Sequence, residues 1–430
     1  MNLKRLLIFP VFLGVTGISF CQESYKDTLT VTLQRVDSIF ISQNLTLLAE
    51  KCNIESSKAL IIQAKLFKNI NFSISQNVHN PYYETMRGKQ WFDFTDKGET
   101  VIAVQKLFLI AGKRNKQIGL AQSGALKEEQ YYFDLLRTLK FSLHSQFSNI
   151  YYLGQIIKVY EREISSLNKL SLVFQAEEGK GFISKKEVLR IKASLFSLEN
   201  EKLGYITQMI SAQTELNTLL HTTNLFYLPV WMPDSSYKNS PESFKLQDLI
   251  DTAYMYRYDL KMARSDFDIS NLNLSYQKAL AIPDVTVSGG WDKNGGYFHN
   301  YNYVGLSFDL PLFDRNQGNI KSAKFNAESN RYKVETAGDQ VKADVINAVS
   351  NAIETNRLYF RFDKTFLSDL KSMNDEMLKN FEKRNISLIE FLDYYDAYKT
   401  NAIQLNTLMY NRINSFENIN FAVGKDIMTR

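Results

Sequence analysis

Two stretches of the chain have a hydrophobic pattern typical of long helices that pack in pairs. Between residues 113 and 176, apolar side chains recur every seven residues in two series, and Gln146 is the one gap in the second. The first series is Leu136, Leu143, Ile150, Ile157 and Ile164, and the second is Leu139, Leu153, Tyr160, Leu167 and Phe174. Because this segment lacks proline, it predicts one uninterrupted helix, about 95 Å long at about 1.5 Å per residue.

A second proline-free stretch, from about Gln317 to Gly424, predicts another helical hairpin. Its outgoing half has an eleven-residue period, which favours one helix with a straight or right-handed seam. The repeating residues are Tyr359, Phe362, Phe366, Leu370, Met373, Met377 and Phe381. The two hairpins reverse at 177–181 and 383–385, and each return helix is predicted to begin at a capping box, a serine three residues before a glutamate. These pairs are Ser184 with Glu187 and Ser387 with Glu390.

Alternating polar and apolar residues predict four strands, two ahead of each hairpin. They are expected at about 70–78, 101–110, 284–292 and 301–310. Each is about as long as a strand that crosses a bilayer at a tilt. In the fourth, Val304, Leu306 and Phe308 are expected to face lipid, and Ser307 and Asp309 to face an aqueous lumen. An ordinary half-buried hairpin of a soluble domain is the alternative.

The same order of elements occurs twice, about 200 residues apart. Residues 183–189, Ile-Ser-Lys-Lys-Glu-Val-Leu, recur at 386–392 as Ile-Ser-Leu-Ile-Glu-Phe-Leu. We therefore divide the chain into a first repeat at 22–220, a linker at 221–244 and a second repeat at 245–430. Each repeat is expected to hold a helix, two strands and a long helical hairpin. In the first repeat that initial helix is predicted at 28–68.

Residues 1–21 have the features of a secretory signal peptide. A basic start and an apolar run from Leu6 to Phe20 precede Cys21, where a small-x-small pattern predicts cleavage. Lipid attachment to Cys21 is the alternative, and the bulky Phe20 argues against it. Cleavage after Cys21 leaves Cys52 as a single thiol, which cannot form an intrachain disulfide.

Charge and motif content argue against several classes of function. The net charge of +5 forms no basic stripe, so no nucleic-acid partner is expected. The four histidines have no cysteine, histidine or carboxylate partner at metal-ligand spacing. Nucleotide-binding and nucleophile motifs do not occur. We therefore expect no enzyme activity, no cofactor and no bound metal.

Residues 304–320, Val-Gly-Leu-Ser-Phe-Asp-Leu-Pro-Leu-Phe-Asp-Arg-Asn-Gln-Gly-Asn-Ile, resemble the TolC-type outer-membrane efflux proteins. The strand ending in Pro-Leu-Phe, followed by Arg-Asn-Gln-Gly at the start of a helix, is most similar to the branch that serves cation and heavy-metal pumps. The two tip motifs also resemble that family, and the likeness covers nearly the whole chain after residue 21. The second tip departs from the family because Lys383-Arg384-Asn385 contains no glycine.

This resemblance implies a mixed, mainly α fold with a duplicated unit of a β-hairpin and a long coiled-coil helical hairpin. Four strands cannot close a membrane barrel, since the smallest has about eight. Three chains would give a twelve-strand β-barrel with an open bore, continued by an α-helical tube in the periplasm. The implied location is the outer membrane of a Gram-negative bacterium. The implied partners are lipid, a periplasmic adaptor and an inner-membrane pump, proton-driven in preference to ATP-driven.

The resemblance also implies that a passive exit duct docks its adaptor and opens its gate at the helical tips. The docking candidates are Gly179, Gly181, Ser184, Glu187, Arg384, Ser387 and Glu390. Asp375 and Glu376 precede the second tip and are candidates for a charged ring at the gate, with a solvated helix face as the alternative. Two other functions remain open: the exit duct of a type I protein-secretion system, and a coiled-coil scaffold that forms no channel.

Overall fold

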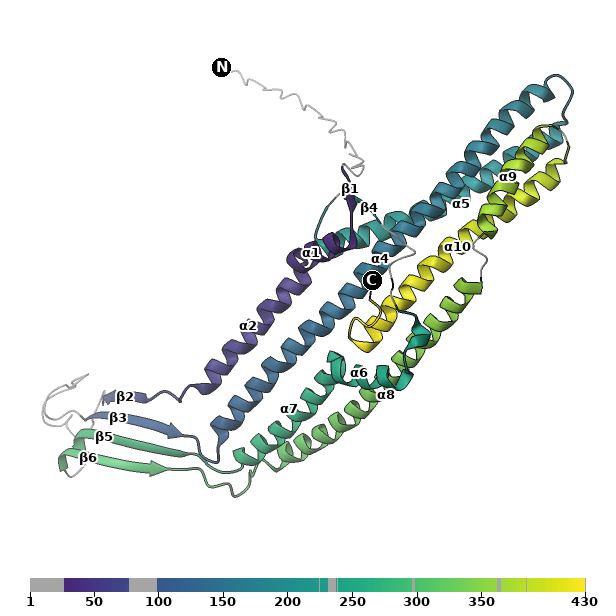
Figure 1. The fold of residues 1–430 in the computed structure, drawn as a ribbon. Coiled ribbons are helices and arrows are strands. Elements are labelled where there is room, and N and C mark those ends of the chain that lie inside the picture. The colour runs from purple at the N-terminus through teal and green to yellow at the C-terminus, as the bar shows by residue number, and fades with distance from the viewer. Residues whose placement is uncertain are drawn as a thin grey trace, which may run out of the picture.

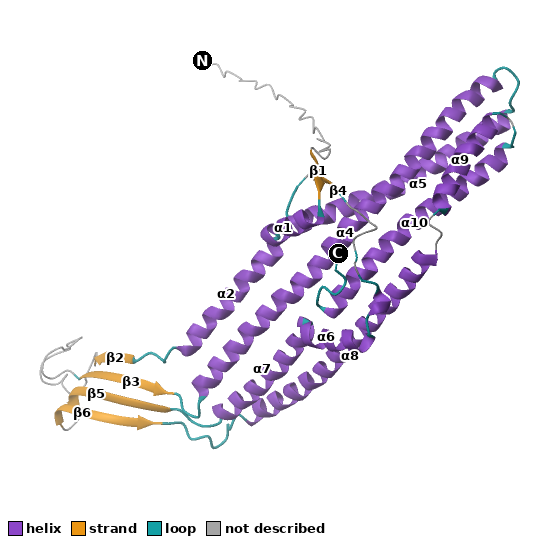
Figure 2. Cartoon of the chain, viewed as in Figure 1, coloured by secondary structure: helices purple, strands orange, loops and turns teal. Residues whose placement is uncertain are grey.

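The computed structural model is an elongated molecule with a β-sheet at one end and helical tips at the other (Figure 1). Long helices join the two ends (Figure 2). The structure describes residues 27–76, 99–223, 225–230, 237, 239–295, 298–361, 365–383 and 385–429. The signal peptide predicted at 1–21, and the choice between cleavage and lipid attachment at Cys21, lie outside these ranges.

Four antiparallel strands form the sheet, in the order β2-β3-β5-β6. They are β2 (Asn71–Gln76), β3 (Thr100–Phe108), β5 (Val285–Gly295) and β6 (Phe298–Ser307). The four predicted strands are confirmed, although β5 extends beyond its predicted end at 292. Strand β6 is displaced toward the N-terminus of its predicted range, so Phe308 and Asp309 lie beyond its end. Because β3 pairs with β5, the two repeats meet in mid-sheet and β2 and β6 are left as its edges.

One face of this sheet is mostly apolar across all four strands. Residues directly opposite each other in antiparallel strands lie on the same face. The paired rows on the apolar face are Ile74, Ile102 and Trp291; Phe72, Val104 and Val304; and Val287 with Leu306. The opposite face is mostly polar and includes Asn71, Ser73, Ser75, Gln105, Thr286, Ser288, Asp292 and Ser307. Val304 and Leu306 are 85% and 70% exposed in the single chain, so none of the described residues covers these two side chains.

Left-handed turns and a buried ion pair set the direction in which the helices leave the sheet. Gly112 has φ +66° just before the first long helix, a conformation that glycine adopts without strain. The ammonium of Lys113 then contacts the Asp284 carboxylate at 2.7 Å and is shielded from solvent, since its side chain is 4% exposed. It also donates to the Ile282 carbonyl oxygen at 2.6 Å. In the second repeat, Asn316 has φ +57° at the equivalent junction.

Helix α4 (Lys113–Glu178) confirms the long helix that the seven-residue pattern predicts, and α5 (Lys185–Leu220) returns beside it. The predicted seam is its packing face, since Leu143, Leu153 and Leu167 are at most 4% exposed. The seam contributes to two separate cores. Leu143 and Leu153 belong to a core at mid-molecule, and Leu167 belongs to a core near the tips.

The second hairpin consists of α8 (Gln317–Arg361), α9 (Phe366–Glu382) and α10 (Leu388–Val423). The prediction of one continuous outgoing helix is wrong, because α8 ends at Arg361 and a new helix begins at Phe366. The apolar pattern continues across the break without a common buried face: Phe366 is 38% exposed, whereas Phe381 is 7% exposed. A hydrophobic period records which residues face a core, and two helices in succession can share it.

The helix predicted at 28–68 is confirmed over Leu33–Gln43 and Leu45–Lys65, but its start is wrong and two helices stand in place of one. Strand β1 (Asp27–Val31) pairs in parallel with β4 (Leu225–Pro229), and α1 (Leu33–Gln43) and α2 (Leu45–Lys65) follow. Asn44 separates the two helices. Its side-chain oxygen accepts from the Leu47 N–H at 3.0 Å and caps α2, while its amide donates to the Leu219 carbonyl at 2.8 Å. The predicted linker therefore contributes β4 and a short 3-10 turn at Pro241–Ser243 to the fold. We call the region of these short elements, together with β1 and α1, the waist.

The second repeat begins with α6 (Leu246–Tyr256) and α7 (Tyr258–Leu280). Below the waist, α2, α4, α7 and α8 lie side by side in that order (Figure 1). Above it the order is α5, α4, α10 and α9. We call these two rows of helices the wall. One edge of the wall is α2 and α5, and the other edge is α8 and α9. Among the described elements, no further helix covers either edge.

Candidate functional site at the paired helical tips

The first tip is a short turn closed by backbone hydrogen bonds. After α4 ends, the Phe182 N–H donates to the Glu177 carbonyl at 3.0 Å and the Gly181 N–H donates to the Glu178 carbonyl at 2.8 Å. Gly181 has φ +80°, so a β-branched residue there would be strained. Gly179 has a right-handed backbone, φ −59°, so its conformation does not require glycine.

A complete capping box begins the first return helix, as predicted. The Ser184 hydroxyl accepts from the Glu187 N–H at 3.3 Å, and the Glu187 carboxylate accepts from the Ser184 N–H at 3.0 Å. The two side chains also hydrogen-bond directly at 2.7 Å. These bonds satisfy backbone donors that the start of a helix otherwise leaves unpaired. The cap therefore holds the turn and the first residues of α5 in one fixed arrangement.

The second tip has the same cap in a reduced form. Ser387 accepts from the Glu390 N–H at 3.2 Å and begins α10. Among the described contacts, only this half of the predicted second box is formed. The Asn385 N–H donates to the Asn380 carbonyl at 2.9 Å and closes the turn. Arg384 lies outside the described residues.

A cleft of about 590 Å³ lies between the two tips. Of the predicted docking residues it brings together Glu187 and Ser387, whereas Gly179, Gly181, Ser184 and Glu390 do not line it. Its remaining lining includes Lys169, Phe174, Phe182, Ile183, Leu378 and Phe381. Phe182 is 65% exposed at the mouth, so the cleft presents an apolar surface with charged and hydroxyl groups at its rim. Such a surface suits a partner helix with a mixed apolar and polar face.

Stacked aromatic rings form the floor between the tips, and the sequence patterns did not assign them a role at the site. The Phe174 and Phe381 ring centroids are 5.4 Å apart, and those of Phe381 and Phe391 are 4.8 Å apart. Phe174 and Phe381 each close one of the hydrophobic series in the sequence. That shared position at the ends of both series is the signal by which their meeting could have been found.

An ion-pair network joins the two hairpins farther down, and sequence spacing could not have revealed it. The Glu201 carboxylate on α5 accepts from Lys399 on α10 at 3.0 Å and from the Tyr160 hydroxyl on α4 at 3.1 Å. Lys399 also contacts Asp396 at 2.8 Å. We call these four residues the Glu201 clamp. Glu201, Lys399 and Asp396 line a second groove of about 350 Å³, with Arg190 and Asp393 on its walls.

The protonation states of the clamp favour its closed form. Burial alone would raise the pKa of Glu201, but the hydrogen bond and charge of Lys399 outweigh it and hold that pKa below its usual value. Burial alone would lower the pKa of Lys399, and its bonds to Asp396 and Glu201 raise it instead. Both groups are therefore ionised at neutral pH.

The two gate candidates lie on α9, several residues before the second tip. Glu376 is exposed, and for Asp375 the structure gives the helical position. Glu376 does not line the cleft between the tips, so the single chain does not bring it together with the docking candidates.

Within the described ranges, no group of three or more His, Cys, Asp or Glu side chains is arranged to hold a metal ion. No helix in the same part of the chain is both long and apolar enough to cross a membrane. The cleft between the tips lies at the far end of the molecule from the sheet.

A sheet with one apolar face, two long helical hairpins and a waist of short elements together define the fold of the TolC-type outer-membrane efflux channels. The resemblance drawn from residues 304–320 and the two tip motifs is confirmed at the level of the fold. No model of a known protein family matches the sequence. No curated protein matches it either.

Three solved structures illustrate the likeness. The CmeC outer membrane channel of Campylobacter jejuni has a TM-score of 0.76 and 13% identity, over 92% of this chain and 86% of that one. CusC, whose structures concern folding and transmembrane channel formation, has a TM-score of 0.74 and 13% identity, over 91% of this chain and 92% of that one. The open state of the Neisseria gonorrhoeae MtrE outer membrane channel has a TM-score of 0.69 and 14% identity, over 92% of this chain and 89% of that one. The similar scores leave the cation-pump branch a prediction.

Proposed function

We propose that this chain is the outer-membrane exit duct of a tripartite efflux system. It passively passes substrates from an inner-membrane pump, proton-driven in preference to ATP-driven, through a periplasmic adaptor to the outside. The observation that carries the proposal is that the two ends of a molecule with a channel-type fold differ in chemistry. One end is a sheet with an apolar face, and the other is a pair of capped tips around a cleft.

Uncovered apolar stripes on the wall edges support assembly into a closed ring of three chains. On α5 the exposed residues are spaced by seven: Leu189, Phe196, Leu203 and Ile210. On α8 they are Phe325, Tyr332 and Ile346, which fit the same spacing. A seven-residue apolar stripe is the seam that one helix presents to another. Because α5 and α8 lie on opposite edges of the wall, each seam meets a neighbouring copy in a head-to-tail ring.

The sheet edges support the same ring. β2 and β6 each have one unpaired side, and three sheets of four strands then close into a barrel of twelve. The face of Val304 and Leu306 would lie against lipid and the face of Ser307 against the lumen. Lys106 shares the apolar face near its helical end, with its ammonium 5.4 Å from the Phe108 ring centroid. That position suits a lysine at the membrane interface, where its charge reaches water.

Loss of export through altered tips tests the duct and its docking surface together. In a strain lacking the native gene, the double variant Gly181→Val and Ser387→Val should assemble normally but fail to restore resistance to pump substrates. Valine strains the left-handed turn at 181, and loss of the Ser387 cap costs about 1 kcal/mol. The measurement is the minimum inhibitory concentration at matched amounts of assembled protein.

Gly318→Ala is the control, because a methyl group there meets open space far from the tips. Normal resistance with the double variant would contradict docking at the tips. No loss of resistance on deleting the gene, under conditions in which it is expressed, would contradict the efflux function itself.

A ring of acidic residues near the second tip is the proposed gate. In three chains, Asp375 and Glu376 would give like charges close together, which favours bound cations. Asp375→Ala with Glu376→Ala should raise single-channel conductance in a planar bilayer and weaken block by divalent cations. The control is Asp369→Ala, a neighbouring acid near the start of α9. Unchanged conductance and unchanged block would place the gate elsewhere.

A further inference from the structure

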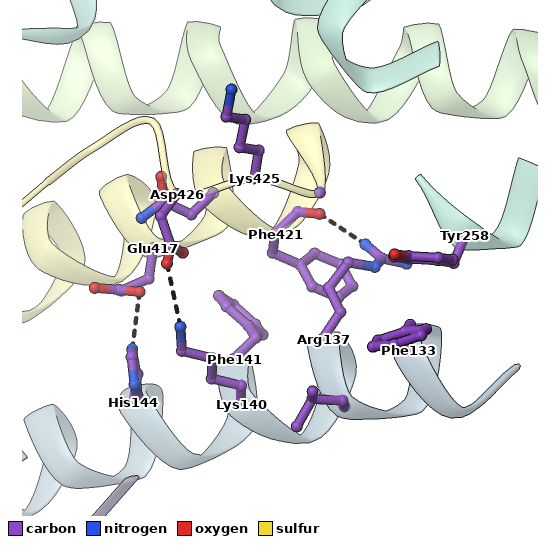
Figure 3. Close-up of a pocket in the computed structure, with 13 residues that line it drawn as sticks. Phe133, Arg137, Lys140, Phe141, His144, Tyr258, Glu417, Phe421, Lys425 and Asp426 are labelled. Carbon is purple, nitrogen blue, oxygen red and sulfur yellow. Dashed lines mark hydrogen bonds and ion pairs between the residues drawn. The ribbon is translucent and has the colours of Figure 1, made fainter. Parts of the chain in front are cut away.

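A histidine at the waist connects three helices through two carboxylates. His144 lies on α4 with its side chain 9% exposed. Its Nδ1 is 3.0 Å from the Glu417 carboxylate on α10, and its Nε2 is 2.9 Å from the Asp37 carboxylate on α1. Figure 3 shows His144 and Glu417 facing each other across the space between the two helices. No other described contact joins α1, α4 and α10 through a single side chain.

The chemistry of this contact requires a charged ring. A neutral imidazole has one N–H donor and one acceptor nitrogen, whereas the imidazolium donates from both nitrogens. Between two ionised carboxylates, only the imidazolium satisfies both bonds. Burial lowers the pKa of His144, but the hydrogen bonds to Asp37 and Glu417 outweigh burial and raise that pKa above its ordinary value.

The surrounding charged groups are engaged with other partners, so they do not replace His144. Tyr237 donates to the second oxygen of Glu417 at 2.6 Å. From α5, Glu215 accepts from Ser142 and Gln146. The remaining nearby ion pairs and charge contacts are Arg137 with Asp134, Lys140 with Asp426, and Lys425 over the Tyr256 ring.

Protons can reach the contact from solvent. His144 and Glu417 line an open cavity of about 240 Å³, together with Arg137, Lys140 and Phe421 (Figure 3). That volume holds several water molecules, and its walls offer them polar partners. Asp37 is the more accessible carboxylate, 29% exposed against 9% for Glu417. It is therefore the partner that water replaces more easily.

We propose that His144 is a proton-operated clamp at the waist, which holds α1 and the end of α10 to α4 when charged and releases α1 when neutral. The stabilisation is fully present below the unfolded pKa of about 6.5 and is lost as pH rises through the higher folded pKa. The equilibrium for release changes by about tenfold for each unit by which the two pKa values differ.

The proposed role of His144 is testable by NMR, since the chain contains only four histidines. In protein with isotope-labelled histidine, one resonance should titrate above pH 6.5 and be absent from His144→Gln. Hydrogen exchange, corrected for intrinsic rates, should show less protection in α1 above that pKa. The His144→Gln variant should lack this pH dependence. His221→Asn, at an exposed left-handed position that asparagine tolerates, is the control and should behave as the parent.

Two results would overturn the proposal: a His144 resonance that titrates below pH 6.5, or equal pH dependence of exchange in the parent and His144→Gln. A second variant keeps the test independent of folding in His144→Gln. Glu417→Gln removes one carboxylate, so it should lower the pKa of His144 in the folded chain. An unchanged titration in Glu417→Gln would show that the ring does not sense Glu417.

Discussion

Arginine in place of Leu306 is expected to block insertion of the chain into the outer membrane. Leu306 lies on the apolar face of the sheet, 70% exposed in the single chain and paired with Val287. A charged side chain on a lipid-facing strand costs about 2–4 kcal/mol at the membrane midplane and less toward the interfaces. Val304→Arg lies two residues farther from the helical end of β6, so it should reduce membrane assembly more than Leu306→Arg does. The measurement is the amount of heat-modifiable oligomer in outer-membrane fractions.

Ser307→Arg is the matched control, since it places the same side chain at the adjacent residue on the opposite face. It should assemble at the level of the parent and alter only conduction. Equal tolerance of arginine at 306 and 307 would show that the two faces do not meet lipid and lumen. Equal failure of both would show that assembly is sensitive to any change at this end of β6.

Replacing Lys399 by methionine is expected to loosen the tips and raise conductance. Methionine keeps the length of the side chain but loses both the bond to Glu201 on α5 and the bond to Asp396. Hydrogen bonds to charged groups contribute about 1.5–3 kcal/mol. Because Glu201 is 38% exposed, solvent screening puts the effect near the lower end, a shift of about tenfold toward the open tip. Single-channel recording measures it directly.

Lys192→Met controls for the loss of a positive charge, because Lys192 is an exposed residue of α5 in the same hairpin. It should leave conductance unchanged. Glu201→Gln should reproduce the effect of Lys399→Met, and the double variant should be no more conductive than either single variant, since both remove one interaction. Additive effects would mean that the two residues act separately and that the clamp is not the unit that holds the hairpins.

The sequence predicted the elements whose signal is local. The seven-residue seam gave α4, the alternation gave the strands, and serine followed by glutamate gave the start of α5 at Ser184. Each of these depends on residues close together in the chain. The helix predicted at 28–68 began too early and missed the break at Asn44, because the apolar content continues through β1 and past Asn44. Helix breaks made by one polar residue change the hydrophobic pattern very little.

What the sequence could not predict depends on contacts between distant residues. Lys399 and Glu201 are 198 residues apart, and His144 and Glu417 are 273 apart. Each pair forms only after two hairpins pack, so no spacing within one helix indicates it. The prediction that Ser387 and Glu390 form a full box was half right, because Glu390 does not return the bond. Asp375 and Glu376 remain a prediction, since a ring of charges needs neighbouring copies.

The uncovered stripes on α5 and α8 have a genetic consequence. A chain with intact edge seams is expected to enter a ring whatever the condition of its tips, because the proposed contacts between chains lie along the edges. In the proposed ring of three chains, a cell that makes parent and tip-defective chains in equal amounts would hold only about one ring in eight with three parent chains. We therefore expect tip defects to be dominant and defects that destroy an edge seam to be recessive, since chains without a seam would be excluded from the rings of their neighbours.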